Sequence, residues 1–192
     1  MKSCFAEVLD DILLRSAEAL FKERGIDLSA NRSQPPSGGS LPPPAALEAH
    51  VAAFVPFSGA AIRGSLMLVC PFDIAAAGRG RRAGAVLSTR VASDWIVARD
   101  WVGELANLLL GRIKNRLLAF RVEFSIAPPV PLSGRALAVA LQANRAARQI
   151  AFGRGDQIVR VLIDVVDEPA LMSTKPHASA EPSALEGDVI EF

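Results

Sequence analysis

The sequence predicts an α+β domain, in which long helices pack on a mainly antiparallel sheet and a further amphipathic helix stands at the N-terminus. Two stretches repeat apolar residues at helical spacing, one near the N-terminus and one between residues 100 and 118. Between and after them come short apolar segments with glycine turns, which is the pattern of antiparallel strands. The hydrophobic content of 51% over 192 residues is enough for one sizeable core.

Composition divides the chain into four parts. The N-terminal helix occupies residues 1–28, and a connector rich in proline, glycine and serine follows at 29–46. The folded domain spans 47–167, after which residues 168–192 lose the apolar pattern and place prolines among small and acidic residues. Because the connector and the C-terminal tail offer few side chains to bury, we expect both to be flexible.

The N-terminal helix is predicted from about residue 3 to residue 24. Its apolar residues share one face and are Phe5, Val8, Leu9, Ile12, Leu13, Leu20 and Phe21. Gly25 stands where helices commonly end with a left-handed residue. The polar face mixes acidic and basic residues and lacks the basic excess of a membrane-surface helix. Packing against the domain is therefore favoured over binding to a membrane or a partner.

Two apolar segments, 47–57 and 62–69, predict a β-hairpin. Gly59 falls in the turn between them, and Gly64 falls near the start of the second strand. His50 lies in the first strand, and no neighbour in sequence would orient it as a base or a metal ligand. We therefore interpret His50 as an ordinary strand residue.

A second helix is predicted from about residue 74 to residue 89, after Pro71 ends the preceding strand. Asp73 is placed to cap its first turn. The segment contains AAAGRGRRAG, whose glycines suggest a phosphate-binding loop, but it lacks the lysine and hydroxyl residue of that motif. We interpret the arginines between residues 79 and 82 as a solvated basic cluster, with attraction of an acidic partner or nucleic acid as the alternative.

The central helix is predicted from residue 100 to residue 118, DWVGELANLLLGRIKNRLL, and its two sides differ in character. The apolar side should be buried and consists of Val102, Leu105, Leu109, Ile113 and Leu117. The opposite side carries Asp100, Glu104, Asn107 and Gly111, which we name the polar stripe. A glycine in mid-helix costs about 0.5–1 kcal/mol relative to alanine, so Gly111 indicates a place where another surface approaches.

The segments after the central helix predict the rest of the sheet. Residues 120–126 alternate well enough for a strand, and the prolines between 128 and 131 should keep the chain extended as far as Gly134. Further strands are expected at 136–141, 149–152 and 158–166, with a hairpin turn at 153–156.

Several partners and compartments are disfavoured by composition. The net charge of +1 lacks the basic excess of a typical nucleic-acid binder. Trp95 and Trp101 bracket the start of the central helix as core anchors, and the chain has no tyrosine to build a stacking surface. Cys4 and Cys70 lie far apart, and no apolar run reaches the length of a membrane span. We expect a cytoplasmic protein with reduced cysteines and neither a nucleic acid nor a membrane as partner.

The sequence also contains no sign of a self-contained hydrolase. It has no nucleophile elbow, no HExxH motif, no metal-binding cluster and no Cys-His pair in a suitable context. Any chemistry at the polar stripe must therefore be completed by a partner.

The polar stripe spells D-x3-E-x2-N, which resembles the active-site helix motif of the CheC and CheX class of chemotaxis phosphatases. FSGAAIRGSLMLV at 57–69 is similar to the first hairpin of that class, and SIAPPVPLSG at 125–134 is similar to its proline-then-glycine turn. The resemblance covers roughly residues 47–166. Only one E-x2-N occurs, since the later candidate at 141–144 offers Gln142. The resemblance thus implies the single-site, CheX-like branch, which is typically a homodimer.

The resemblance implies a CheC-like fold and hydrolysis of the aspartyl phosphate of a phosphorylated CheY-type response regulator. Asn107 would orient the attacking water, because an amide hydrogen-bonds water but cannot act as a base. Glu104 would pair with the active-site lysine of the receiver domain. Asp100 would extend that contact or stabilise the start of the helix, and Gly111 would admit a receiver loop. The chain itself is expected to bind no cofactor or metal, since the receiver supplies Mg2+.

Two other function classes stay open. A CheX-like interaction module could bind a response regulator or a flagellar or other signalling component without catalysis, although a pure binding surface has no particular need for the amide of Asn107. A nucleic-acid-binding domain would use the arginines between Arg79 and Arg160, and its binding would depend steeply on salt.

Overall fold

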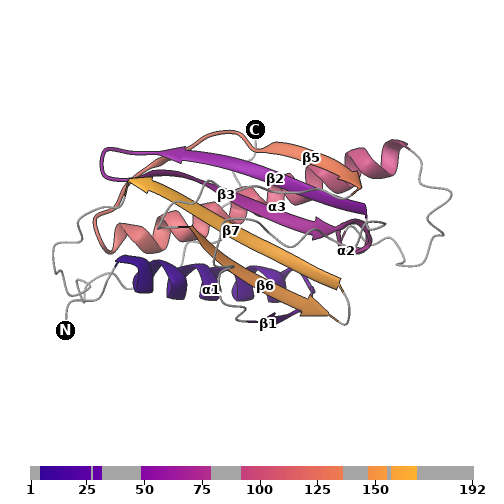
Figure 1. Ribbon diagram of the computed structural model, residues 1–192, viewed down its shortest axis with the longest axis horizontal. Helices are drawn as coiled ribbons and strands as arrows, with labels where there is room; N and C mark the ends of the chain where they lie inside the picture. Colours follow the sequence, from indigo (N-terminus) through magenta and orange to yellow (C-terminus); the bar gives the residue numbers. More distant parts are fainter. Residues whose placement is uncertain are drawn as a thin grey trace, which may run out of the picture.

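The computed structural model shows two long helices packed on one sheet (Figure 1). It describes residues 5–26, 28–31, 49–78, 92–135, 147–154 and 157–167. The helices are α1 (Phe5–Glu23), α2 (Phe72–Ala77) and α3 (Ala92–Leu118). The strands are β1 (Ser29–Asn31), β2 (Ala49–Ser58), β3 (Arg63–Pro71), β4 (Ser125–Ile126), β5 (Val130–Arg135), β6 (Arg148–Arg154) and β7 (Gln157–Asp167).

The strands form a single antiparallel sheet in the order β1-β6-β7-β3-β2-β4, and β5 pairs with β2 beside β4. The long hairpin of β2 and β3 aligns His50 with Pro71 at one end and Ser58 with Arg63 at the other. This arrangement confirms the predicted α+β class and the hairpin that the two apolar segments indicated.

The core lies between the inner face of the sheet and the helices α1 and α3. Inward residues of β7, among them Val161 and Ile163, join one buried cluster with Leu13 of α1 and Leu109 of α3. Phe21 of α1 meets Phe152 of β6 edge-on, with the ring centroids 5.0 Å apart. The helix near the N-terminus therefore packs against the domain, as its mixed polar face predicted.

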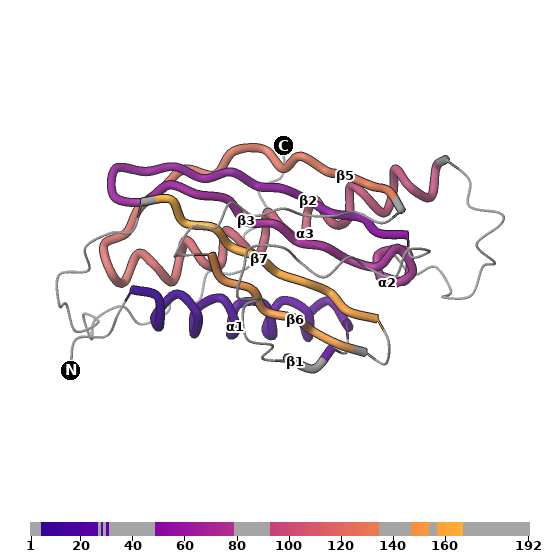
Figure 2. Tube along the Cα trace, viewed as in Figure 1, coloured from indigo at the N-terminus to yellow at the C-terminus, as the bar shows by residue number. Residues whose placement is uncertain are grey.

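The predicted connector begins later in the structure than in the sequence prediction. Its first residues, Ser29–Asn31, form β1 and pair antiparallel with β6 at the edge of the sheet (Figure 2). Composition did not reveal this strand because main-chain hydrogen bonds to β6 require no particular side chain. Residues 32–46 of the connector and the predicted tail, 168–192, lie outside the described residues.

The helix predicted from about residue 74 to residue 89 is wrong at both ends, since α2 starts before residue 74 and stops at Ala77. The described helix α2 begins at Phe72, and Pro71 takes the N-cap position that was predicted for Asp73, which lies in the first turn. Gly78 follows the last helical residue, and a Cβ there would overlap the ring of Trp101. The predicted basic cluster, between residues 79 and 82, lies outside the described residues.

The central helix starts earlier than its amphipathic pattern predicted. It begins at Ala92, so both Trp95 and Trp101 lie within it rather than bracketing its entry. Trp95 packs on Phe72 of α2 with the ring centroids 4.5 Å apart, and this contact stabilises the added turns. The predicted apolar side is confirmed as buried, at Val102, Leu105, Leu109, Ile113 and Leu117.

The strand predicted from 120 to 126 is only two residues long, Ser125–Ile126, because the chain first forms the turn that follows α3. Arg121 takes a left-handed φ of 59°, and its N–H donates to the Leu118 carbonyl oxygen at 2.9 Å. The following proline segment stays extended, as predicted, but forms β5 rather than a turn. Pro131 is tolerated there because β5 pairs with β2 alone among the described strands.

The strands predicted at 149–152 and 158–166 are confirmed as β6 and β7, which pair up to Arg154 and Gln157. Gly155 and Asp156 of the predicted turn lie outside the described residues, as do the predicted strand at 136–141 and the segment 141–144. Cys70 and His50 are buried in the hairpin, and burial raises the pKa of the Cys70 thiol. Cys4 lies outside the described residues.

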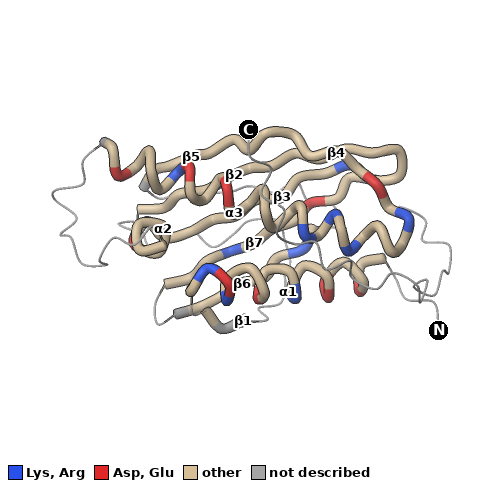
Figure 3. Tube along the Cα trace, turned by 180° about the vertical axis from the view of Figure 1, so that it is seen from behind, with Lys and Arg blue, Asp and Glu red and all other residues tan. Residues whose placement is uncertain are grey.

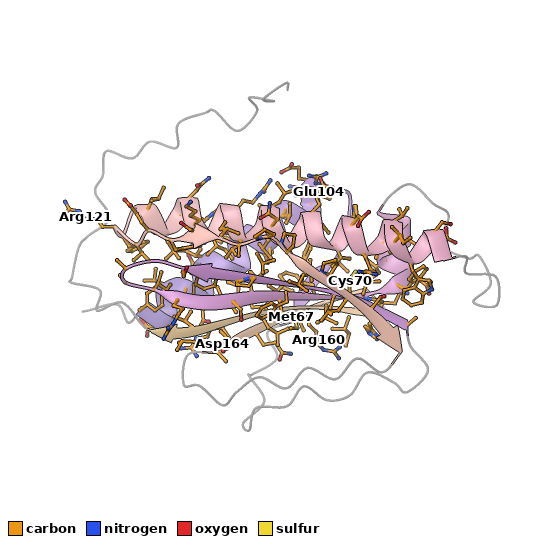
Figure 4. The ribbon with its side chains drawn as sticks, turned by 90° about the horizontal axis from the view of Figure 1, so that it is seen from above. Met67, Cys70, Glu104, Arg121, Arg160 and Asp164 are labelled. Atoms are coloured by element: carbon orange, nitrogen blue, oxygen red, sulfur yellow. The ribbon has the colours of Figure 1, made fainter. Side chains whose placement is uncertain are left out.

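Asp164 of β7 lies on the sheet face that points away from α3 (Figure 4). It is half-buried, and its Oδ1 atom has no hydrogen-bond partner in the described part of the chain. Burial raises the pKa of Asp164 above its ordinary value. The folded state thus binds a proton at Asp164 more tightly than the unfolded state does, and this contribution to stability is lost as the pH rises through the raised pKa.

Asp164→Asn is therefore expected to stabilise the protein at pH 7, because the amide carries no charge to desolvate. We expect the thermal midpoint to rise by about 2 °C, which for a chain of this size corresponds to a gain in the free energy of unfolding of under about 1 kcal/mol. Thermal unfolding at pH 7 and pH 4 tests this, since the advantage should shrink at the lower pH. Asp11→Asn, on the exposed surface of α1, is the control and should bring no gain. A thermal midpoint for Asp164→Asn below that of the parent at pH 7 would contradict the prediction.

Candidate functional site

The polar stripe lies on α3, whose 27 residues run about 40 Å across one face of the sheet (Figure 4). The buried side of α3 packs along its length, from Ala98, which is 1% exposed, to Leu117, which is also 1% exposed. A helix held by buried side chains from Ala98 to Leu117 presents its outer side at a fixed orientation. The side chains of the polar stripe are therefore mounted on a rigid support.

The predicted stripe residues fall where the helical projection placed them. Asp100, Glu104 and Asn107 are exposed, and Gly111 is half-buried. The Glu104 side chain is 52% exposed. Glu104 and Asn107 are three residues apart and so lie on neighbouring turns of one helix face, where a single partner can contact both.

Gly111 has no structural requirement for glycine within the described part of the chain. A Cβ built at this position would meet no atom within 4 Å. Gly103, on the buried side of the same helix, differs because a Cβ there would contact Pro129 at 3.8 Å. The open space above Gly111 is consistent with the prediction that another surface approaches the helix at this point.

Charge divides along α3 (Figure 3), and in the sequence Asn107 lies between the last acid and the first of the bases that follow it. The first half carries the acids Asp94, Asp100 and Glu104 together with the single base Arg99. The second half carries the bases Arg112, Lys114 and Arg116 and no acid. Basic residues in the last turns also offset the partial negative charge of the helix C-terminus. The acidic half therefore provides the part of the stripe that would attract a cationic side chain.

The C-terminal end of α1 borders the polar stripe through two ion pairs. Arg24 Nη2 lies 3.6 Å from Glu104 Oε1, and Arg112 donates to Glu23. The hydrogen bond from Arg112 and its positive charge hold the pKa of Glu23 below its ordinary value. A candidate site that the sequence placed on one helix is thus built from two.

Arg24 and Ile96 were missed by the sequence analysis. Nothing in the sequence links Arg24 to Glu104, because the two residues lie far apart in the chain and meet only when the helices pack. Ile96 is 56% exposed and falls on the same side of α3 as the stripe. Ile96 lies one helical turn before Asp100. It would have been found if the predicted helix had begun at a lower residue number.

The described residues hold neither a candidate metal-binding cluster nor a candidate membrane-spanning helix. They contain no group of three or more histidine, cysteine, aspartate or glutamate residues that could hold a metal ion. No helix among them is long and apolar enough to cross a membrane.

Comparison with solved structures places the fold. CheX from Vibrio vulnificus has a TM-score of 0.65 at 17% identity, covering 82% of this chain and 98% of that one. CheX from Desulfovibrio desulfuricans gives a TM-score of 0.65 at 14% identity, covering 82% and 98%. The CheX of a Borrelia burgdorferi complex with CheY, BeF3 and Mg2+ gives 0.60 at 14% identity, covering 81% and 96%. At these identities the likeness shows the fold alone, and it confirms the CheC-like fold.

Comparison of sequences gives the family. No curated protein matches the chain. The sequence profile of the family described as chemotaxis phosphatase CheX matches residues 51–153, which include most of the hairpin, α3 and the whole polar stripe. This match covers more than half of the 192 residues. The chain belongs to the CheX family of chemotaxis phosphatases.

Proposed function

We propose that this protein accelerates hydrolysis of the aspartyl phosphate of a CheY-type response regulator. The observation that carries the proposal is the exposed pair of Glu104 and Asn107, held at fixed orientation on α3 of a CheX-family chain. The B. burgdorferi structure, in which a CheX is bound to CheY with BeF3 and Mg2+, supports a partner of this class.

Asn107 would act by orienting water. Its amide oxygen and NH2 group can hydrogen-bond one water molecule and hold it in line with the phosphorus atom. An amide does not accept a proton at neutral pH, so the contribution of Asn107 is one of position. Phosphoryl transfer suits this division of labour, because its catalysis rests mainly on positioning and on neutralising charge.

Glu104 would fix the docked position by pairing with the active-site lysine of the receiver domain, a contact that strengthens as the interface excludes water. Mg2+ and the phosphorylated aspartate would both belong to the receiver. Asp100 would add negative charge beside Glu104. We also propose that the protein is a homodimer, as is typical of the single-site branch.

Phosphate release from the CheY-type regulators of the source organism tests this function. Each regulator is phosphorylated, mixed with Mg2+, and followed with and without this protein. Accelerated phosphate release from at least one regulator is the expected result. Binding without acceleration would instead identify a non-catalytic interaction module, and neither binding nor acceleration with any regulator would overturn the proposal.

Gly111→Ala separates docking from folding. The new Cβ enters open space and removes a mid-helix glycine, so the free energy of unfolding should rise by about 0.5–1 kcal/mol. Dephosphorylation should nevertheless slow by about 10-fold, equivalent to about 1.4 kcal/mol, because the methyl group blocks close approach of the receiver. Denaturant unfolding and phosphate release measure the two effects on the same samples.

Ala119→Gly, just beyond the end of α3, is the control for an exchange between glycine and alanine away from the polar stripe. It lies two turns past Gly111, so it should leave phosphate release unchanged. If Gly111→Ala stabilises the fold and keeps full activity, the receiver does not approach the helix at this position.

A further inference from the structure

The contact between Arg24 and Glu104 joins the end of α1 to the polar stripe. Arg24 Nη2 lies 3.6 Å from Glu104 Oε1, which is beyond hydrogen-bond range but within the range of an ion pair. The side chains are 37% and 52% exposed, so the pair is open to solvent at the surface where the receiver would dock. Arg24 thus reaches the carboxylate that the proposed function assigns to the receiver's lysine.

The end of α1 is held firmly enough for Arg24 to act from a fixed place. Gly25 closes the helix with a left-handed φ of 67°, and its N–H donates to the Lys22 carbonyl oxygen at 3.1 Å. Phe21, in the last turn, is 2% exposed and packs edge-on against Phe152. The backbone of Arg24 is therefore anchored to the sheet as well as to α1.

A second ion pair strengthens the junction of the two helices. Glu23 precedes Arg24 and pairs with Arg112, two turns beyond Glu104 on α3. The two ion pairs have opposite polarity. At the end of α1 the acid Glu23 meets a base of α3, and the base Arg24 meets an acid of α3. This opposite polarity favours one alignment of the helices, in which Arg24 faces Glu104.

We propose that Arg24 is a positioning residue that holds the Glu104 carboxylate over α3 for the lysine of a phosphorylated receiver domain. The inference rests on the proposed function. An exposed glutamate samples several rotamers, and ordering it on binding costs free energy that a pre-formed contact reduces. Arg24 lies outside residues 51–153, the part matched by the family, so the N-terminal helix becomes a part of the docking surface.

Because Arg24 acts on Glu104 and not on the water near Asn107, its removal should affect KM more than kcat. Arg24→Ala is expected to raise KM for the phosphorylated receiver about 3- to 10-fold and to leave kcat within about 2-fold. Arg24→Lys retains the charge and should recover most of the loss. Arg15→Ala removes an arginine of α1 that forms an exposed pair with Asp11, and it is the matched control that should leave KM unchanged.

A double-mutant cycle identifies the path of the effect. Arg24→Ala should raise KM in the parent protein but not in a Glu104→Ala background, where there is no carboxylate to hold. Equal effects in both backgrounds would show that Arg24 contacts the receiver directly and would overturn the inference. Thermal unfolding of each variant accompanies the kinetics, and a fall in stability that accounts for the rise in KM would overturn it as well.

The inference and the proposed function fail in different ways. If the parent protein accelerates phosphate release and Arg24→Ala has the same KM, only the role of Arg24 is wrong. If the parent neither accelerates release nor binds a BeF3-treated receiver, the proposed function is overturned and the role of Arg24 with it. An elevated KM that disappears when Glu104 is absent supports both.

Discussion

Asn107→Ala is expected to lower the rate of receiver dephosphorylation about 100-fold, a loss of about 2.7 kcal/mol of transition-state stabilisation. Alanine removes the only group that the proposal assigns to the attacking water, while the receiver keeps its Mg2+ and lysine. The fall should appear in kcat, because Glu104 still fixes the docked position. Single-turnover phosphate release, with a saturating amount of this protein, measures the change without interference from product release.

The fold should survive this substitution, because Asn107 is exposed and alanine is the better helix former. Asn115→Ala makes the same change at another exposed position of α3, two turns further on, and should leave the rate unchanged. Full activity in the Asn107→Ala protein would show that water is oriented by another group. A loss of activity accompanied by unfolding would show instead that Asn107 has a structural role.

Periodicity predicted the parts of the fold in which one face is buried. The apolar side of α3 and the hairpin of β2 and β3 could be read from the sequence because burial selects apolar residues at fixed spacing. The start of α3 could not be predicted in this way, because the helical turns around Trp95 depend on packing against α2. β1 also escaped prediction, because strand pairing at a sheet edge uses main-chain groups that every sequence has.

The candidate site shows the same division. The positions of Glu104 and Asn107 follow from the repeat of a single helix, so their exposure could be predicted. Arg24 belongs to another helix, and its distance from Glu104 depends on how α1 crosses α3. Local sequence carries no information on that crossing. The region matched by the CheX family begins at residue 51, so it does not include α1 either. Contacts between elements therefore required the structure.

Gly64→Ala is expected to be among the most destabilising small substitutions in this chain. The sequence indicated only that Gly64 lies near the start of the second strand of the hairpin, and the structure gives the reason for glycine. A Cβ there would overlap the carbonyl oxygen of Asp164 on β7 and lie 2.8 Å from Cζ of Phe57. Phe57 has no room to move, since it is 3% exposed and its ring centroid lies 4.8 Å from that of Phe124.

Relieving this overlap requires β3 and β7 to separate, which would weaken the centre of the sheet on which α3 rests. We expect a loss of about 3 kcal/mol, which lowers the thermal midpoint by about 6–12 °C. Gly153→Ala is the matched control, because its Cβ on β6 would meet no atom of the described residues within 4 Å, and the substitution should leave stability unchanged or slightly raised. If thermal unfolding shows the two alanine variants to be equally stable, the backbones of β3 and β7 are not as close as the structure places them. If Gly64→Ala is destabilised but keeps its activity at a temperature where it is folded, the sheet serves α3 as a support and not as part of the catalytic surface.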